Sequence, residues 1–218
     1  MYHYLTANTI SELICFVFAA ICLLKDTNVV WRCMILYLLI TCIAEFAGVY
    51  VEIKSRNNQW VYNIFLLFEG GFTILMFGYI FNQLNKSKLI IITGLALFVT
   101  LYAYELVIHG FLVYNYLTYK SMSVLYVLYS LYYYFLLLTD DGYVSLKYAS
   151  VFWWVTGTLF FYFGNTAVNL FDSRLAEVKI FGDQYLTYFI YKILNITLYG
   201  CWSYSFICRK LLMSKSKI

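Results

Sequence analysis

Long apolar runs, separated by short polar connections, are the main pattern of this 218-residue sequence. Each run has about the twenty residues that an α-helix needs to cross the hydrocarbon core of a bilayer. We predict seven such helices, with boundaries where the apolar runs meet polar residues. They cover residues 5–24, 33–51, 60–81, 89–108, 117–138, 151–170 and 185–207. No connection is long enough for a soluble domain, so we predict a single transmembrane domain over residues 1–218.

The pattern indicates helices rather than a β-barrel. A barrel strand would alternate apolar and polar residues over about ten positions, whereas these runs are continuously apolar. Backbone groups in lipid must be hydrogen-bonded within the chain, which a helix achieves by itself. The sequence contains no proline, so no helix is expected to have a proline kink. The predicted fold is all-α, a bundle of fairly straight transmembrane helices.

The composition agrees with a membrane protein. Hydrophobic residues make up 63% of the chain and charged residues 12%, and the mean hydropathy is +0.75. Soluble domains are typically about 45–50% apolar and about 25% charged. We therefore expect a multi-pass protein of a cell membrane, with the lipid bilayer as its main partner. The net charge of +4 resides partly in the C-terminal tail, where it favours contact with anionic lipid headgroups over binding of nucleic acid.

The distribution of lysine and arginine predicts the orientation, because cytoplasmic loops are enriched in both. With the N-terminus outside, nine of these residues lie on the cytoplasmic side and five on the outer side, while Lys192 is inside a predicted span. The nine are Lys25, Arg32, Lys86, Lys88, Lys147, Arg209, Lys210, Lys215 and Lys217, and the five are Lys54, Arg56, Lys120, Arg174 and Lys179. We therefore predict that the N-terminus is outside and the C-terminus inside.

Ionisable and amide side chains lie inside several predicted spans, where an acidic or basic residue costs about 2.5–3.5 kcal/mol at the helix centre. Such residues usually face the bundle interior and mark functional sites. The predicted ligand-binding residues are Glu45, Glu69, Glu105, Lys192, Asn165, Asn169, Asn195 and Tyr62. In the predicted orientation nearly all of them fall in the outer half of the bundle, and only Glu69 and Asn195 reach the midplane.

Helical spacing places polar residues on shared faces. Residues four, three and four positions apart point the same way from a helix. The faces are Thr41, Glu45, Gly48 and Glu52; Thr158, Tyr162, Asn165 and Asn169; and Tyr188, Lys192, Asn195 and Tyr199. We predict a largely acidic pocket that opens to the outer surface and closes near Glu69, where Gly70 and Gly71 leave space.

The same residues also have a structural interpretation, in which they hold the helices together. Interhelical hydrogen bonds in membrane bundles contribute about 0.6 kcal/mol each. Lys192 can pair with a carboxylate, and Glu12 and Glu105 lie close enough to span ends to reach the interface. However, one ammonium group cannot neutralise these two carboxylates together with Glu45 and Glu69. The remainder must be protonated, hydrated or matched by a cation from outside.

Several classes of site are missing from the sequence. The six cysteines form no CxxC motif, and two histidines are too few for a convincing metal site. We assign no disulfide, no metal and no cofactor. Glycine-rich phosphate loops, HExxH and GxSxG are also absent. We therefore do not expect an enzyme.

Three segments resemble an uncharacterised family of small bacterial seven-helix integral membrane proteins. They are WRCMILYLLITCIAEFAGVYVEIKSRNNQWVYNIFLLFEGGFTIL (31–75), FWWVTGTLFFYFGN (152–165) and YKILNITLYG (191–200). The family pattern includes a glutamate followed by glycine in the second helix and a YN-x-x-x-x-x-E pattern in the third, matched here by Glu45 and by Tyr62, Asn63 and Glu69. The resemblance implies the architecture and a bacterial inner membrane, and it emphasises Glu45 and Glu69. It implies no mechanism.

Three functions fit these observations. The favoured hypothesis is a receptor-like protein that binds or senses a small cationic or polar ligand and signals through a membrane or cytoplasmic partner. The first alternative is a proton- or ion-coupled small-molecule transporter, with Glu45 and Glu69 as titrating groups. The second is a structural or oligomerising membrane subunit. A dry aromatic plug in the inner half of the bundle would favour sensing, and a hydrated path there would favour transport.

Overall fold

The computed structural model describes residues 6–55, 57–83, 88–139, 145–171, 175, 178–181 and 184–215. These residues form seven long α-helices, a short 3₁₀ helix and a two-stranded hairpin. The helices are α1 (Ala7–Leu23), α2 (Val29–Ser55), α3 (Gln59–Gln83), α4 (Lys88–His109), α5 (Tyr116–Thr139), α6 (Ser150–Leu170) and α8 (Leu186–Lys215). The 3₁₀ helix η1 is Leu146–Tyr148, and strand β1 (Lys179–Phe181) pairs antiparallel with β2 (Gln184–Tyr185). The predicted all-α bundle is confirmed, whereas the apolar pattern did not predict the hairpin.

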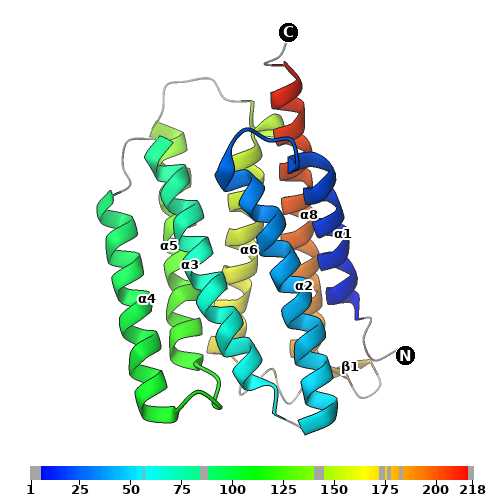
Figure 1. Ribbon diagram of the computed structural model, residues 1–218, viewed down its shortest axis with the longest axis vertical. Coiled ribbons are helices and arrows are strands. Elements are labelled where there is room, and N and C mark those ends of the chain that lie inside the picture. Colours follow the sequence, from blue (N-terminus) through cyan, green and yellow to red (C-terminus); the bar gives the residue numbers. More distant parts are fainter. Residues whose placement is uncertain are drawn as a thin grey trace.

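Consecutive helices run antiparallel, and six of them form a ring (Figure 1). Around this ring α1 packs against α2, α2 against α3, α3 against α5, α5 against α6, α6 against α8, and α8 returns to α1. α4 lies outside the ring, against α3 and α5. We call the end that contains the start of α1 and β1 the lower end, and the end that contains the α1–α2 connection and the end of α8 the upper end, as drawn in Figure 1.

The helix boundaries agree with the predicted spans to within a few residues, except for α2 and α8. α2 extends beyond both predicted ends, and α8 continues past residue 207 to Lys215. The start of α2 is capped by Asn28, whose side-chain Oδ1 accepts a hydrogen bond from the amide of Val30 at 3.0 Å. At the end of α8, Arg209 and Lys210 are good helix formers, so the helix does not stop where the apolar run stops.

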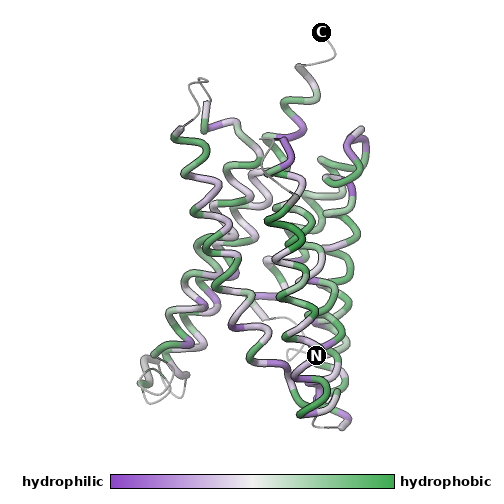
Figure 2. The backbone as a smooth tube through the Cα atoms, turned by 90° about the vertical axis from the view of Figure 1, so that its left-hand side faces the viewer, coloured by the Kyte–Doolittle hydropathy of each residue, from purple (hydrophilic) through white to green (hydrophobic). Residues whose placement is uncertain are grey.

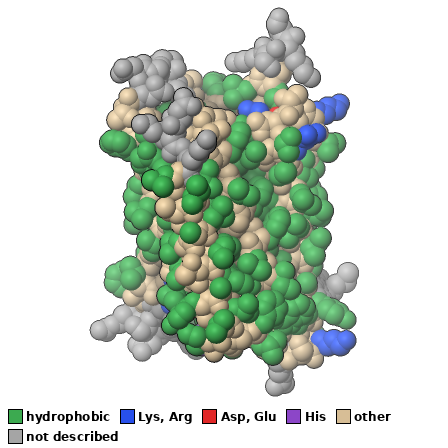
Figure 3. Space-filling view, turned by 60° about the vertical axis from the view of Figure 1, so that its left-hand side comes forward, with side chains coloured by type: hydrophobic (Ala, Val, Ile, Leu, Met, Phe, Trp, Pro, Cys, Tyr) green, Lys and Arg blue, Asp and Glu red, His purple; other side chains and the backbone are tan. Residues whose placement is uncertain are grey.

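The outer surface between the two ends is apolar. Figure 2 shows hydrophobic residues along the length of the helices, and Figure 3 shows hydrophobic side chains over the side of the visible face, with lysine and arginine near its upper and lower ends. Of the described helices, four are long and apolar enough to cross a membrane: Val29–Ser55, Gln59–Gln83, Leu89–His109 and Tyr116–Thr139. A fifth, Ala7–Leu23, is apolar but shorter. A membrane protein is supported, while seven crossings and their orientation remain predictions.

Several of the lysines and arginines counted for the orientation lie outside the described residues. Arg56, Lys86, Arg174 and Lys217, which contribute to the count of loop charges, belong to that group. The N-out assignment therefore still depends on the sequence.

The upper half of the bundle interior is filled by stacked aromatic rings. Trp154 stacks on Trp202 with ring centroids 5.6 Å apart, and Phe77 meets the edge of Trp154 at 5.3 Å. We call this set the aromatic layer; its members are Phe77, Phe81, Tyr126, Tyr129, Trp154 and Trp202. All six side chains are buried. The layer fills this part of the interior with packed aromatic side chains.

Glycines allow close packing at three helix contacts. A Cβ at Gly157 would lie 2.8 Å from the Cβ of Cys201, so α6 and α8 approach closely there, and Gly164 faces Leu194 of the same pair of helices. Both glycines therefore serve the close packing of α6 against α8. A Cβ at Gly70 would lie 2.5 Å from the Phe98 ring of α4, so Phe98 takes up the space expected for a ligand. Gly71 has no described neighbour within 4 Å of an added Cβ.

Candidate functional site

A cavity of about 550 Å³ lies inside the ring, on the lower side of the aromatic layer. Its lining comes from α1, α2, α3, α5, α6 and α8 and from the α4–α5 connection. The lining residues are Asn8, Glu12, Tyr37, Thr41, Glu45, Tyr62, Phe65, Glu69, Tyr114, Tyr119, Phe161, Tyr162, Tyr188, Tyr191, Asn195, Leu198, Tyr199 and Trp202. Along α8 the lining runs from Tyr188 near the helix start to Trp202, about 21 Å at 1.5 Å per residue. The cavity therefore extends from the lower end into the middle of the bundle.

Three carboxylates from three different helices line this cavity. Glu45 of α2 and Glu69 of α3 are each ten residues from the ends of these helices at the α2–α3 connection, Ser55 and Gln59. At 1.5 Å per residue both lie about 15 Å into the bundle. Glu12 of α1 is the third, and it lines the same cavity as Glu45 and Glu69. The three acidic side chains thus face one space.

Glu12 and Glu69 differ in how their oxygens are satisfied. Glu69 Oε1 accepts a hydrogen bond from the Tyr162 hydroxyl at 2.7 Å, and its side chain is half-buried. Glu12 is only 3% exposed, and its Oε2 has no hydrogen-bond partner among the described residues. A buried carboxylate oxygen without a partner is costly. Glu12 therefore brings to the cavity wall a polar atom that a ligand could satisfy.

Tyrosine dominates the wall of the cavity. The lining includes eight tyrosines: Tyr37, Tyr62, Tyr114, Tyr119, Tyr162, Tyr188, Tyr191 and Tyr199. Several of these rings are held in place by other aromatic rings; for example, Tyr162 packs against Tyr126 with centroids 4.8 Å apart. Each ring offers either a hydroxyl group or an electron-rich face to a ligand.

The described lining of the cavity contains acidic and neutral groups but no lysine, arginine or histidine. Among the predicted site residues, Lys192 carries an ammonium group, and its Nζ lies 4.3 Å from the centroid of the Tyr188 ring. Lys192 was predicted to pair with a carboxylate, whereas its described contact is a cation–π contact with Tyr188. Within the described parts of the chain, no group of three His, Cys, Asp or Glu side chains is arranged to hold a metal ion.

The floor of the cavity is closed toward the upper end. Tyr37 and Trp202 line its deepest part, and Trp202 belongs to the aromatic layer. Beside Glu69, the Tyr126 hydroxyl donates a hydrogen bond to the carbonyl oxygen of Gly70 at 3.1 Å. The small gap between these groups has no room for a water molecule. The cavity is therefore separated from the upper end by packed side chains.

Four of the eight predicted site residues line the cavity, namely Glu45, Glu69, Asn195 and Tyr62, and the other four do not. Glu105 instead caps the start of α5. Its Oε1 accepts a hydrogen bond from the amide of Leu117 at 2.8 Å, and its Oε2 accepts from the amide and the hydroxyl of Thr118 at 2.7 and 2.6 Å. A carboxylate at a helix N-terminus satisfies orphan N–H groups, so this contact is structural.

Asn165 and Asn169 form a hydrogen-bonded network outside the cavity lining. Asn165 is fully buried, and its Nδ2 donates to the Ser123 hydroxyl at 3.0 Å. Its Oδ1 accepts from Asn169 Nδ2 at 3.2 Å and from the Tyr191 hydroxyl at 3.1 Å. The network connects α5, α6 and α8, which is the role that the structural interpretation gave to such residues.

The prediction omitted one of the three carboxylates and most of the tyrosines. Glu12 was placed near a span end with access to the interface, yet it is buried. A signal was present in the spacing of α8, where Tyr188, Tyr191, Asn195 and Tyr199 follow intervals of three and four residues. The predicted face already contained Tyr188, Asn195 and Tyr199, with Lys192 in the place of Tyr191, but its tyrosines were not assigned to the site because tyrosine is abundant along the whole chain.

Comparisons with protein-family models, with curated proteins and with solved structures gave no match. The resemblance to a bacterial membrane-protein family stays a prediction, and the function is argued from the cavity itself.

Proposed function

We propose that this protein binds a small organic cation in the acidic, tyrosine-lined cavity and acts as a receptor-like sensor in the membrane. The observation that carries the proposal is the convergence of Glu12, Glu45 and Glu69 on one cavity whose described lining has no cationic residue. A cation in this space would be attracted to the three carboxyl groups and would supply a partner for the Glu12 oxygen that has none among the described residues.

The tyrosines favour an organic cation over a bare metal ion. Ammonium groups bind to the faces of aromatic rings with about 0.5–2 kcal/mol, the larger value applying when water is excluded. The eight tyrosines of the lining provide such faces together with hydroxyl groups. The cavity size also lies within the range of about 300–1,000 Å³ that is typical of small-molecule sites.

The aromatic layer favours binding over passage through the protein. A transported cation would have to cross the packed rings of Phe77, Trp154 and Trp202, which are almost completely buried. A sensor needs no such path, because Trp202 lines the cavity and stacks within the layer and can pass on a change in packing. Our proposal includes a partner at the upper end that receives this change.

The proposal also includes the placement in the membrane. All seven helices would cross the bilayer of a bacterial inner membrane, with the lower end and its cavity outside and the upper end in the cytoplasm. The charge distribution of the sequence supports this orientation.

Thermal-shift titrations of the purified protein with a series of alkylammonium ions test the proposal. The variants are Glu12→Gln, Glu45→Gln and Glu69→Gln, which keep the shape and remove the charge. Glu52→Gln is the matched control, because Glu52 lies on α2 but is exposed and outside the cavity lining. We expect a saturable increase in melting temperature that is retained by the control. The cavity variants should bind about tenfold more weakly, as expected when a charged hydrogen-bond partner is lost.

Two results would contradict the proposal. One is the absence of any alkylammonium-dependent shift in the wild-type protein. The other is an equal shift in the wild type and in all three cavity variants.

A further inference from the structure

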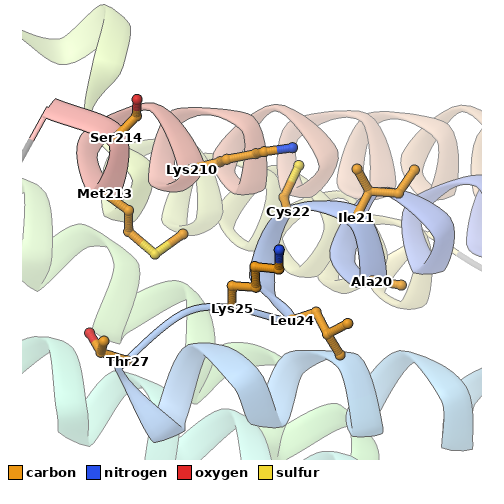
Figure 4. Close-up of a pocket in the computed structure, with 9 residues that line it drawn as sticks. All are labelled: Ala20, Ile21, Cys22, Leu24, Lys25, Thr27, Lys210, Met213 and Ser214. Atoms are coloured by element: carbon orange, nitrogen blue, oxygen red, sulfur yellow. The ribbon is translucent and has the colours of Figure 1, made fainter. Parts of the chain in front are cut away.

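A second hollow lies at the upper end, far from the acidic cavity. It has a volume of about 680 Å³ and lies between the end of α1, the α1–α2 connection and the end of α8 (Figure 4). Its lining residues are Ala20, Ile21, Cys22, Leu24, Lys25, Thr27, Lys210, Met213 and Ser214. We call it the upper groove.

Two lysines give the upper groove a positive charge. Figure 4 shows the ammonium groups of Lys25 and Lys210 pointing into the same space, from the α1–α2 connection and from α8. The described lining contains no aspartate or glutamate. Both side chains are exposed, and neither has an acidic partner among the described residues. An anion would therefore be attracted by two charges that the protein leaves unmatched.

The positions of the two lysines are set by the ion pair next to them. Asp26 and Arg209 are the sequence neighbours of Lys25 and Lys210, and they form a bidentate pair. Arg209 Nε lies 2.7 Å from Asp26 Oδ2, and Arg209 Nη2 lies 3.2 Å from Asp26 Oδ1. The amide of Asn28 donates a further hydrogen bond to Asp26 Oδ1 at 2.8 Å. This pair fixes the connection to α8, so the backbones that carry both lysines are held in place before any ligand binds.

The depth of the upper groove matches the boundary between acyl chains and headgroups. On α1 a stripe of exposed apolar residues ends beside Lys25, and its members are Ile10, Ile14, Val17, Ile21 and Leu24. On the other wall, α8 has 30 residues and is about 45 Å long. It therefore exceeds the hydrocarbon thickness of about 30 Å. With all seven helices crossing the bilayer, as proposed above, Lys25 and Lys210 would lie at the level of the phosphate groups, with Ile21 and Leu24 beside the acyl chains.

We propose that the upper groove binds one anionic phospholipid, with its phosphate between Lys25 and Lys210 and the first part of an acyl chain against Ile21 and Leu24. Basic pockets between transmembrane helices commonly bind anionic lipid headgroups. The combination of two ammonium groups with apolar residues favours a lipid over a free phosphate ion, which would use only the charged part. This proposal is independent of cation binding in the cavity.

Native mass spectrometry of the purified protein with phosphatidylglycerol tests the inference. The variants are Lys25→Gln, Lys210→Gln and the double variant, and Lys147→Gln is the matched control. Lys147 is exposed at the same end of the bundle but does not line the groove. We expect each groove variant to bind about fivefold more weakly, and the double variant about 25-fold, from the usual contribution of a lysine near an anionic headgroup. The control should retain wild-type affinity.

Three further arms complete the experiment. Phosphatidylcholine should bind at least tenfold more weakly than phosphatidylglycerol, and glycerol phosphate or inorganic phosphate should not compete for the site. Melting temperatures in phosphatidylcholine check that every variant is folded. The inference is overturned if Lys147→Gln loses as much affinity as Lys210→Gln, if both lipids bind equally, or if inorganic phosphate displaces the lipid.

Discussion

The acidic cavity of the lower half and the ion pair of the upper end treat buried carboxylates differently. In the lower half, Glu12, Glu45 and Glu69 face a common cavity, and one oxygen of Glu12 has no partner. In the upper half, the interior is aromatic, and the buried carboxylate of Asp26 is fully matched by Arg209 and by a backbone amide. The same chain can thus pair a carboxylate well. We infer that Glu12, Glu45 and Glu69, which have no cationic partner in the described lining of the cavity, serve to bind a ligand.

The largest expected effect comes from the aromatic layer. Trp154→Ala removes a fully buried ring that contacts Phe77 and Trp202, and we expect the free energy of unfolding to fall by about 3–5 kcal/mol. Tyr188→Ala is the comparison in the lower half, since Tyr188 is 40% exposed and lines the acidic cavity. That variant should lose less than about 1 kcal/mol. Unfolding in mixed detergent micelles measures both, and equal losses would remove the contrast between the halves.

A smaller effect is expected from the matched ion pair of the upper end. Burial alone would raise the pKa of the Asp26 carboxyl, but hydrogen bonds from Arg209 and the Asn28 amide, with the nearby charges of Arg209 and Arg32, bring it below its ordinary value of 3.8. A lowered pKa in the folded state stabilises the protein at pH values above 3.8, and this contribution is lost as the pH falls through the folded-state pKa. Asp26→Asn should therefore cost about 2 kcal/mol at neutral pH.

The pH dependence of this stability difference provides the control. The difference in unfolding free energy between the wild type and Asp26→Asn should shrink as the pH falls below 4. A difference that is independent of pH would mean that the pair contributes nothing through its charge.

Alanine substitutions at two glycines test the helix packing, one at a close helix contact and one beside open space. Gly157→Ala should destabilise the protein by about 1–3 kcal/mol, because the new methyl group would meet Cys201 Cβ at 2.8 Å and the Leu198 carbonyl oxygen at 3.1 Å. Gly71→Ala should be neutral or stabilise by up to about 1 kcal/mol, because it lies in a helix with open space around the added atom. The melting temperatures of the two variants measure this difference. A higher melting temperature for Gly157→Ala than for Gly71→Ala would contradict the packing that we describe.

The smallest effect has the opposite sign. Glu12→Gln replaces a buried carboxyl group, one oxygen of which has no hydrogen-bond partner among the described residues, so we expect the unliganded protein to gain about 1 kcal/mol in stability. The same variant should bind alkylammonium ions more weakly. Gain of stability with loss of binding identifies a functional residue. Loss of both would show that Glu12 is structural.

The sequence predicted the helices well because each long apolar run has the length of a helix that can cross a bilayer, and four of the described helices meet this criterion by length and composition. It predicted Glu45 and Glu69 because a carboxylate far from both span ends has few structural uses. It misplaced Glu105, since the contact with Leu117 and Thr118 depends on how the chain turns between α4 and α5. It could not separate Asn165, which joins three helices, from Asn195, which lines the cavity, because both have the same helical spacing.

Calorimetric titration with two ligands of equal shape and different charge tests the central claim most directly. One is a primary alkylammonium ion, and the other is the alcohol with the same carbon chain. If unmatched carboxylates make the site, the wild-type protein binds the ammonium ion at least tenfold more tightly, and the Glu12→Gln/Glu69→Gln double variant loses this preference. Equal affinity of the wild-type protein for the two ligands would contradict the account.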